Sequence, residues 1–353
     1  MRASNNPSLD AWLGEVVSRN ASDLHLSAGL PPMLRLHGDL IRMDLPVSTH
    51  EDLLNMAGHF MTAEQRRSWE QTFDLDFAYE RPALGRFRVN AFFHHRGAGM
   101  VFRHIAGRIP TLKELDAPAI LADLALKPRG LLLVTGPTGS GKSTTLAAML
   151  DWLNQNTSGH IITVEDPIEF VHTSGRCLVH QREVGAHTAN FNAALRSALR
   201  EDPDAILVGE LRDLETIRLA LTAAETGHLV LATLHTSSAP KTVDRLIDVF
   251  PAQEKEMVRS LLSESLLAVV SQTLCKTVDG AGRVAAFEIM LGTPAIRNLI
   301  REGKIAQMVS SIQTGSSYGM QTLDQSLAQL VKRNLITAQS AKALARLPES
   351  LSA

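Results

Sequence analysis

The sequence predicts an α/β protein of two domains, and three observations lead to this prediction. The chain has 353 residues, more than the roughly 250 to 300 at which a single hydrophobic core stops growing. Strand-like alternation dominates up to about residue 110, whereas apolar strand candidates alternate with helical segments after it. A glycine-rich loop stands directly between one of those strands and a helix. We therefore expect domains at 1–110 and 111–353.

The first domain is expected to be a small α+β unit. Alternation of apolar and polar residues predicts its strands, and a helical pattern lies between them. The expected elements are strands at 23–26, 34–37, 86–93 and 100–104 and a helix at 51–60. We expect the last two strands to form a hairpin around a turn that holds Gly97 and Gly99.

The second domain is expected to contain a mostly parallel sheet, because short apolar runs alternate with amphipathic segments. The expected strands are 131–135, 160–164, 205–208 and 229–233. From about residue 251 to residue 353 the pattern is almost wholly helical. Ligands of open α/β sheets bind beyond the carboxyl ends of the strands. Chemistry is therefore expected where these four strands end.

The most informative motif is a phosphate-binding loop of the pattern G-x-x-x-x-G-K-[ST]. It comprises Gly136, Pro137, Thr138, Gly139, Ser140, Gly141, Lys142, Ser143 and Thr144. The glycines let backbone N–H groups turn toward the phosphates, Lys142 is expected to reach the β and γ oxygens, and the Ser143 hydroxyl is expected to ligate Mg²⁺. The helix that follows directs its positive end at the same anion. The loop predicts that the chain binds ATP with Mg²⁺.

A carboxylate pair follows the strand at 160–164. Glu165 is the candidate general base, because in-line attack of water on a γ-phosphate needs a carboxylate within reach of that water. The alternative interpretation is that Glu165 and Asp166 form a solvated turn.

Two further candidates follow the next two strands. Glu210 comes after the run at 205–208 and occupies the position of a Walker B acid. A Glu there leaves open whether the contact with Mg²⁺ is direct or through a water, and we favour the water. The strand at 229–233 lies between His228 and His235, which a straight strand would hold roughly 23 Å apart. We expect His235 to sense the γ-phosphate and His228 to contact a neighbouring subunit or another domain.

Composition excludes several classes of protein. The formal net charge of -2 does not favour nucleic acid as the main partner, although a local basic patch stays possible. The two cysteines, Cys177 and Cys275, lie far apart and predict neither a disulfide framework nor a zinc site. The first ten residues contain no apolar leader region, and no stretch approaches the 18 apolar residues of a membrane span. We expect any membrane association to be peripheral.

Four ordered segments resemble the Walker A, Asp, Walker B and His boxes of the GspE/PilT family of secretion ATPases. They are residues 136–144, 165–170, 207–210 and 226–236. Residues 21–26 and 86–90 are similar to the family's N-terminal domain, so the resemblance covers nearly the whole chain. It implies a PAS-like α+β domain followed by a RecA-like P-loop domain with a helical C-terminal extension. It also implies a homo-hexameric ATP-hydrolysing motor of type II secretion or type IV pili, which is cytoplasmic and peripheral at the inner membrane.

The segment at 292–302 is similar to the signature of the family's pilus retraction branch. The resemblance implies retraction and disassembly of type IV pili, docking on an inner-membrane pilus platform protein, and a second retraction ATPase as a further candidate partner. Locally, Thr293 can cap a helix that starts with Pro294, with Ile296, Leu299 and Ile300 on one face. A plain amphipathic helix is the alternative interpretation of this segment.

The family resemblance also implies arginines that approach the phosphates from the N-terminal hairpin. By position, Arg88, Arg96 and Arg103 are the candidates, with Arg88 and Arg103 ahead because Arg96 falls in the turn. Arginine suits this role because its planar fork pairs bidentately with phosphate oxygens. The alternative is that these side chains line a solvated sheet face.

Three other functions compete with pilus retraction by this chain alone. A sister group of accessory, PilU-like retraction ATPases is the second interpretation. A DNA-handling secretion ATPase of related fold is the third, although the charge balance opposes it. The last is a module that holds ATP without hydrolysing it, which the presence of Lys142, Glu165 and Glu210 opposes. The sequence does not determine ring symmetry, firing order, the identity of the platform partner, or whether the pilus serves twitching motility or DNA uptake.

Overall fold

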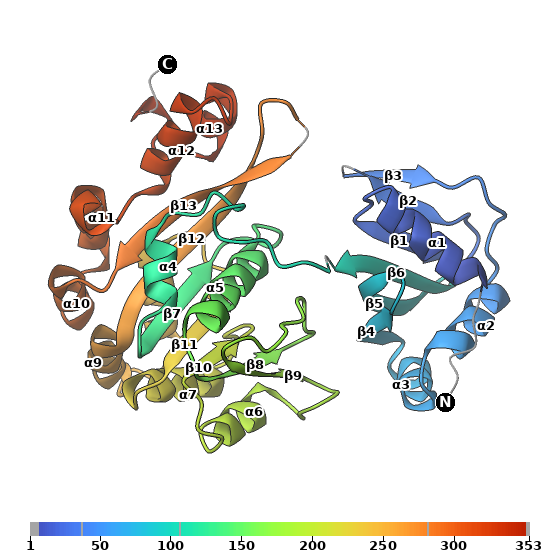
Figure 1. Cartoon of the computed structure of the whole chain (residues 1–353), viewed down its shortest axis with the longest axis horizontal. Coiled ribbons are helices and arrows are strands. Elements are labelled where there is room, and N and C mark those ends of the chain that lie inside the picture. Colours follow the sequence, from blue (N-terminus) through green and yellow to red (C-terminus); the bar gives the residue numbers. More distant parts are fainter. Residues whose placement is uncertain (1–6, 37, 106, 281, 351–353) are drawn as a thin grey trace. The chain divides into compact units, whose positions relative to one another are not determined.

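The computed structural model describes residues 7–36, 38–105, 107–280 and 282–350 (Figure 1). The chain divides into two compact units, Met1–Arg108 and Ile109–Ala353. This division falls close to the boundary expected at residue 110. Residue 37, the last of the strand expected at 34–37, lies outside the described residues.

The described part of the first unit forms an antiparallel sheet with three helices. The strand order is β3-β2-β1-β6-β5-β4, and each neighbouring pair is antiparallel. The strands are β1 (Asp23–Ser27), β2 (Met33–Leu36), β3 (Asp39–Arg42), β4 (Asp74–Arg81), β5 (Gly85–His94) and β6 (Gly97–Ile105). The helices are α1 (Pro7–Ser18), α2 (His50–Phe60) and α3 (Ala63–Thr72). Alternate residues of β5 are buried, including Phe87, Val89 and Ala91, so the sheet has one core face.

The predicted hairpin is present, but its turn is shorter than expected. Gly97 and Gly99 belong to strand β6 and pair with His94 and Phe92 of β5. A Cβ at Gly99 would lie 2.7 Å from the Phe92 ring, so glycine is needed for the two strands to approach. Gly99 therefore marks a close contact between strands, and Gly97 marks a close contact with His50 of α2, where a Cβ would lie 2.7 Å from Nδ1. Neither glycine forms the turn itself.

The second unit is built on a seven-stranded sheet of order β13-β12-β7-β11-β10-β8-β9. All neighbouring pairs are parallel except β12 and β13. The strands are β7 (Gly130–Thr135), β8 (His160–Glu165), β9 (Leu178–Glu183), β10 (Ala205–Val208), β11 (Leu229–Leu234), β12 (Leu266–Lys276) and β13 (Arg283–Leu291). The four predicted strands correspond to β7, β8, β10 and β11.

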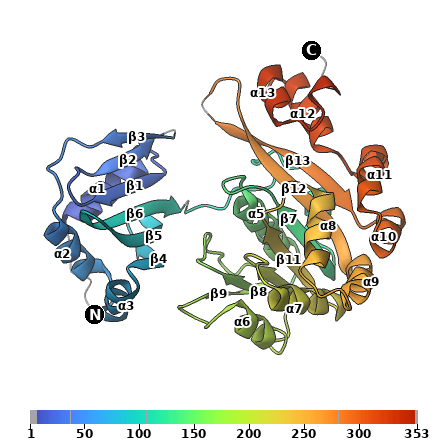
Figure 2. The ribbon, with the colours of Figure 1, turned by 180° about the vertical axis from the view of Figure 1, so that it is seen from behind.

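Helices cover both faces of this sheet, with α4 and α5 on one face in Figure 1 and α7 and α8 on the other in Figure 2. The α-helices are α4 (Ile120–Ala125), α5 (Lys142–Asn156), α6 (Phe191–Ala198), α7 (Leu214–Glu225), α8 (Ala239–Asp248), α9 (Lys255–Ser265), α10 (Pro294–Arg301), α11 (Met308–Thr314), α12 (Leu323–Lys332) and α13 (Ala338–Leu344). Short 3₁₀ helices are η1 (Ile305–Gln307), η2 (Ser316–Tyr318) and η3 (Pro348–Ser350).

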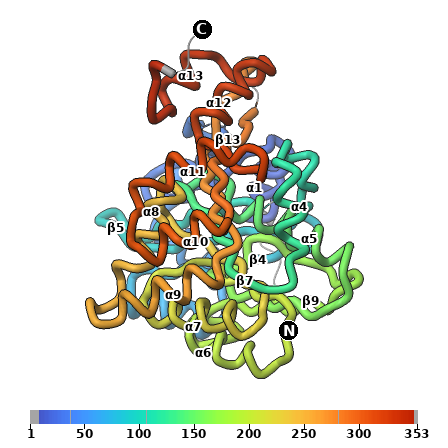
Figure 3. Tube along the Cα trace, turned by 90° about the vertical axis from the view of Figure 1, so that its left-hand side faces the viewer, coloured from blue at the N-terminus to red at the C-terminus, as the bar shows by residue number. Residues whose placement is uncertain are grey.

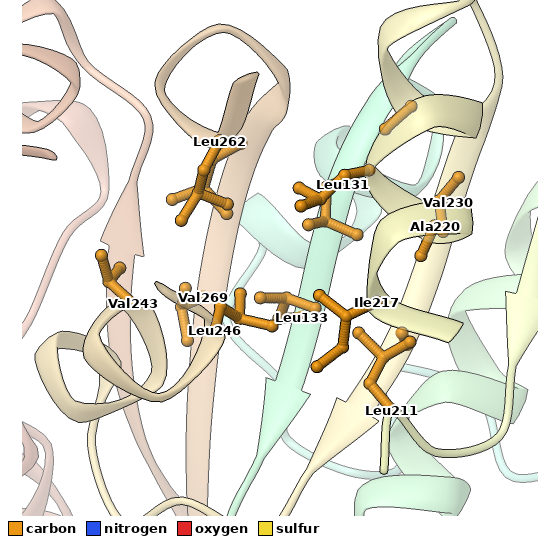
Figure 4. Close-up of a cluster of buried hydrophobic side chains, with 14 of the residues drawn as sticks. Leu131, Leu133, Leu211, Ile217, Ala220, Val230, Val243, Leu246, Leu262 and Val269 are labelled. Carbon is orange, nitrogen blue, oxygen red and sulfur yellow. The ribbon is translucent and has the colours of Figure 1, made fainter. Parts of the chain in front are cut away.

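Successive residues of β7 supply two separate cores. Leu131 and Leu133 pack with residues of α7, α8 and α9, whereas Leu132 and Val134 pack with residues of α4 and α5. Figure 4 shows the first cluster, in which Leu133 lies near Ile217 of α7. Because both faces of the strand are buried, its sequence is a continuous apolar run without alternation.

The expectation that the chain is almost wholly helical after residue 251 is wrong for residues 266–291. Strand β12 adds to β7 in parallel, and β13 returns antiparallel to β12. A short apolar run such as 266–270 cannot be distinguished from a buried helix by periodicity alone. Helices α12 and α13 pack on this hairpin through Cys275 and Ala286. Figure 3 shows α12 next to β13 in the trace.

Candidate active site

The phosphate-binding loop connects strand β7 to helix α5, as predicted. Gly136, Gly139 and Gly141 have φ angles of 146°, 76° and 85°, which L side chains rarely adopt. At Gly136 there is also no room for a side chain, because a Cβ there would lie 2.3 Å from the Gln272 carbonyl oxygen. The Ser140 hydroxyl is buried and has no hydrogen-bond partner within the described part of the chain. This cradle fits a phosphate at the N-terminus of α5.

Lys142 is the first residue of α5 and is only 8% exposed. Its ammonium donates to the Gly136 carbonyl at 3.0 Å and lies 3.5 Å from Nδ1 of His235. Burial lowers the pKa of Lys142 from its usual value, while Glu210 and Glu169 act against that shift. The lysine ammonium therefore lies in a partly desolvated position at the loop. An anionic phosphate bound there would be a partner for its positive charge.

Glu165 ends strand β8 and is held by several hydrogen bonds. Its Oε1 accepts from the Thr163 hydroxyl at 2.7 Å and from Nε2 of Gln181 at 3.2 Å. Its Oε2 accepts from the Glu169 amide at 3.4 Å. Burial raises the pKa of Glu165 above its usual value, and these hydrogen bonds partly oppose the rise. The solvated-turn interpretation of Glu165 does not fit this environment.

Glu165 and Ser143 line one small cavity of about 30 Å³. The other lining residues are Leu146, Ala147, Phe170, His172, Leu207, Gly209 and Thr233. This volume is enough to hold a water molecule. Burial lowers the pKa of His172 to about 4, so its imidazole is neutral at physiological pH. The cavity places the candidate base beside the residue expected to ligate Mg²⁺.

Glu210 and His235 meet beyond the ends of β10 and β11. Nε2 of His235 lies 3.2 Å from Oε1 of Glu210, and the Arg212 guanidinium donates to Oε2 at 2.8 Å. Because His235 also approaches Lys142, three of the predicted residues form one connected cluster. The predicted convergence at the carboxyl edge of the sheet is present.

His228 lies at the opposite end of β11. Its Nδ1 is 3.0 Å from the Ala223 carbonyl and 3.3 Å from the Thr226 hydroxyl, at the C-terminus of α7. The contacts described for His228 are therefore local. Its expected contact with another subunit or domain stays a prediction.

Sequence reasoning missed the polar residues of β12 that support the loop. The Gln272 amide donates to the Ser140 carbonyl at 2.7 Å and accepts from the Thr145 hydroxyl at 2.7 Å. The Ser271 hydroxyl bonds with that of Thr135 at 2.7 Å. These side chains are buried. The sequence contains one signal for these contacts, the polar pair Ser271-Gln272 inside an apolar run. Polar groups that are buried need hydrogen-bond partners, so such a pair predicts contacts with other parts of the chain.

The residues expected to ligate Mg²⁺ have the right ligand atoms, but they are only two. Ser143 and Glu210 offer hydroxyl and carboxylate oxygens, which Mg²⁺ prefers. No group of three or more His, Cys, Asp or Glu side chains suited to a metal occurs in the described residues. Mg²⁺ in nucleotide sites commonly uses one or two protein ligands together with substrate phosphates and waters, so this sparse set is compatible.

The candidate arginines occupy neighbouring strands of the first unit. Arg88 and Arg103 are directly opposite in the register of β5 and β6. Arg88 pairs with Asp76 at 2.7 Å, and Arg103 pairs with the buried Asp23 at 2.9 Å. Arg96 lies in the turn between the two strands. Arg88 and Arg103 thus share one face of the first unit's sheet, and each of them has a carboxylate partner.

The helix predicted at the start of the 292–302 segment is α10. The Thr293 hydroxyl accepts from the Ile296 amide, Pro294 is in the first turn, and Ile296 and Ile300 are buried. Arg297 donates to the Gly292 carbonyl at 2.7 Å and to the carbonyls of 263 and 264 at the end of α9. One arginine of this segment therefore stabilises the α9–α10 packing.

Comparison with known proteins decides the family. The profile of the family described as "Type II/IV secretion system protein" matches residues 3–342. This chain belongs to that family of secretion ATPases. The type IV pilus retraction ATPase PilT of Pseudomonas aeruginosa is 61% identical over 332 residues, which cover 94% of this chain and 96% of PilT. A twitching motility protein of Neisseria gonorrhoeae is 58% identical over 321 residues, which cover 91% of this chain and 86% of that protein.

The family's solved structures agree with the fold. A crystal structure of the pilus retraction motor PilT with bound ADP superimposes with a TM-score of 0.88 at 45% identity, covering 96% of this chain and 97% of that one. The two-domain α/β fold class and the assignment as a P-loop ATPase are thereby confirmed. The type IV pilus ATPase PilU of P. aeruginosa is less similar, at 43% identity over 332 residues, 93% of this chain and 86% of PilU. None of the described helices is both long and apolar enough to span a membrane.

Proposed function

We propose that this chain is the motor ATPase that powers type IV pilus retraction, the process on which twitching motility depends. The observation that carries the proposal is the cluster of Lys142, Glu210 and His235 at the carboxyl edge of the sheet, where strand β8 also ends with Glu165. The chain is 61% identical to the retraction ATPase PilT and 43% identical to PilU. This difference favours retraction as the process that the ATPase activity powers.

Each residue of the cluster has a proposed role in ATP hydrolysis. The loop at 136–144 binds the phosphates, and Lys142 contacts the β and γ oxygens. Glu165 orients the attacking water and accepts its proton. His235 detects whether the γ-phosphate is present. Ser143 and Glu210 would hold Mg²⁺, with Glu210 acting through a water. Bound Mg²⁺ would neutralise developing phosphate charge at Ser143.

Arg88 and Arg103 remain candidates for contact with the phosphates. Their support is their directly opposite placement in β5 and β6, which presents two guanidinium groups on one face. Their ion pairs are partly exposed, with exposed side-chain fractions of 36% for Arg88 and 63% for Arg103. Exchange of a carboxylate for a phosphate is compatible with a weak surface pair such as Arg88–Asp76. Release of Arg103 would leave the buried Asp23 with the more distant Arg35 as its ion-pair partner.

The assembly is proposed from the family. We infer a cytoplasmic homo-hexamer that docks at the inner membrane on a pilus platform protein, with a second retraction ATPase as a further partner. In this arrangement the six subunits would bind and hydrolyse ATP in turn. Light scattering with and without ATP and Mg²⁺ tests the hexamer, and a persistent monomer would contradict it.

A complementation experiment tests the process. A strain lacking the chain's gene should recover pilus retraction with the wild-type chain and not with the Lys142→Ala variant. Full ATPase activity in vitro without recovery of retraction would support the accessory, PilU-like alternative. Stimulation of phosphate release by DNA, lost at high salt, would support the DNA-handling alternative.

A further inference from the structure

We propose that Gln181 of strand β9 is a positioning residue for ATP hydrolysis, because it fixes the carboxylate of Glu165 in the orientation that activates water. The proposal rests on the function of Glu165 as the base proposed above. Gln181 lies outside the four motif segments described above, in a strand that the sequence did not predict.

The pairing of β8 with β9 brings the two residues together. The strands are parallel, with Thr163 opposite Gln181 and Glu165 opposite Glu183. Side chains two residues apart in a strand point to the same face. Thr163, Glu165 and Gln181 therefore share one face at the carboxyl edge of the sheet.

The hydrogen bonds of Gln181 determine the orientation of its amide. Nε2 donates to Glu165 Oε1 at 3.2 Å and to the Phe170 carbonyl at 2.8 Å. Oε1 accepts from the His172 amide at 2.7 Å. Exchange of the amide oxygen and nitrogen would place two acceptors together at Phe170 and two donors together at His172. Gln181 can therefore present only a donor to Glu165.

This donor distinguishes the two oxygens of the base. Oε1 of Glu165 already receives the Thr163 hydroxyl at 2.7 Å as well as Gln181. Oε2 receives only a longer contact from the Glu169 amide, at 3.4 Å, within the described residues. Oε2 is consequently the oxygen with capacity to accept a hydrogen bond from water, and the adjoining cavity is large enough to hold that water.

A base held in this way loses efficiency when its support is removed. Misplacement of a catalytic group by about 1 Å can reduce the rate on the order of 100-fold. Within the described residues, the hydrogen bonds of the Gln181 side chain go to Glu165, Phe170 and His172 and not to the phosphate loop, so its loss should leave nucleotide binding intact. A fall in kcat with little change in KM is the specific expectation.

The experiment compares four variants with the wild type. Gln181→Met removes every hydrogen bond of the side chain at similar length. Gln181→Glu keeps an acceptor for the His172 amide, but its carboxylate does not donate to Glu165. This variant replaces Gln181→Met in the comparison if the Met variant does not fold. Thr163→Val removes the other donor. Gln155→Met, an exposed glutamine that bonds to Asp151, is the matched control.

Steady-state phosphate release gives kcat and KM, and titration with a fluorescent ATP analogue gives the affinity. We expect either Gln181 variant to lower kcat about 10- to 100-fold with KM and affinity within about twofold, and Thr163→Val to lower kcat by a similar or smaller factor. Gln155→Met should match the wild type. A kcat within about twofold of the wild type in a folded Gln181 variant, or an equal loss of affinity and kcat, would overturn the proposal.

A parallel Glu165→Gln variant separates this proposal from the one on which it rests. Normal turnover by Glu165→Gln would remove Glu165 from the role of base and with it the reason for Gln181. An inactive Glu165→Gln beside a fully active Gln181→Met would reject the role of Gln181 alone.

Discussion

The two ends of strand β11 carry histidines in very different surroundings. His235, at the carboxyl end, lies 3.2 Å from a carboxylate oxygen of Glu210 and 3.5 Å from the Lys142 ammonium. His228, at the other end, lies beside the Ala223 carbonyl at the C-terminus of helix α7. The first is in a cluster of charged groups, and the second contacts neutral groups of a helix end.

This difference shows that the sheet confines its chemistry to one edge. The strands between the two ends are apolar and buried on both faces. Charged side chains can therefore gather only where the parallel strands stop, which is where α/β sheets bind ligands. The following substitutions test that contrast, beginning with the largest expected effect.

Removal of the Lys142 ammonium should have the largest effect. Lys142→Ala deletes the buried cation that the phosphate loop presents. We expect ATP affinity and turnover to fall by a factor on the order of 100 or more, because a charge-assisted contact in a desolvated site is lost. Isothermal titration with ATP and Mg²⁺ checks the affinity. Binding at wild-type strength would contradict the assignment of the loop.

His235 should be the next most sensitive position. His235→Asn removes the imidazole between Lys142 and Glu210 while the fold stays intact. We expect turnover to fall about 10- to 100-fold, in the range found for single electrostatic groups in active sites. Phosphate release at saturating ATP measures it. Turnover equal to that of a His228→Asn variant would remove the contrast between the two ends of β11.

Gln272 should affect binding more than chemistry. Gln272→Met removes the hydrogen bonds to the Ser140 carbonyl and the Thr145 hydroxyl at similar side-chain size. The Thr145 hydroxyl would then lack a buried partner, which costs about 1–3 kcal/mol. We expect KM for ATP to rise about tenfold and the melting temperature to fall. A Thr145→Val/Gln272→Met double variant should recover part of the stability, since neither group then lacks its partner.

The pH dependence of turnover should report Glu165. Burial raises the pKa of Glu165, and the base acts as the charged carboxylate. Activity should therefore decline, as pH falls, at a higher pH than an ordinary glutamate would give. His172, whose pKa is about 4, stays neutral above that pH and does not contribute to the decline. A pH profile of kcat/KM checks this, and full activity down to pH about 4.5 would contradict it.

His228 should be the least sensitive position. His228→Asn removes contacts with the Ala223 carbonyl and the Thr226 hydroxyl at the end of α7. We expect turnover by the isolated chain within about twofold of the wild type and a loss of stability of about 1 kcal/mol or less. Thermal unfolding measures the stability. A large loss of turnover would show that the amino end of β11 also takes part in hydrolysis.

The parts of the site that the sequence predicted are local in the chain. The loop at 136–144 is contiguous, and each of Glu165, Glu210 and His235 follows its own apolar strand. Parallel pairing of those strands was enough to bring the residues to one edge.

The parts that were not predicted depend on contacts between distant residues. Gln272 bonds to Ser140 across 132 positions, and the hairpin that carries Gln272 lies in a region whose sequence pattern predicts helices. Gln181 follows an irregular connection after β8, in a strand with few apolar residues. Neither periodicity nor motif spacing contains information about such pairings, because they are determined by tertiary packing.

The most direct test of the central claim is phosphate release by the Glu165→Gln variant at saturating ATP and Mg²⁺, with ATP affinity measured on the same sample. The account predicts that the variant binds ATP about as well as the wild type and releases almost no phosphate. Phosphate release at the wild-type rate would contradict it.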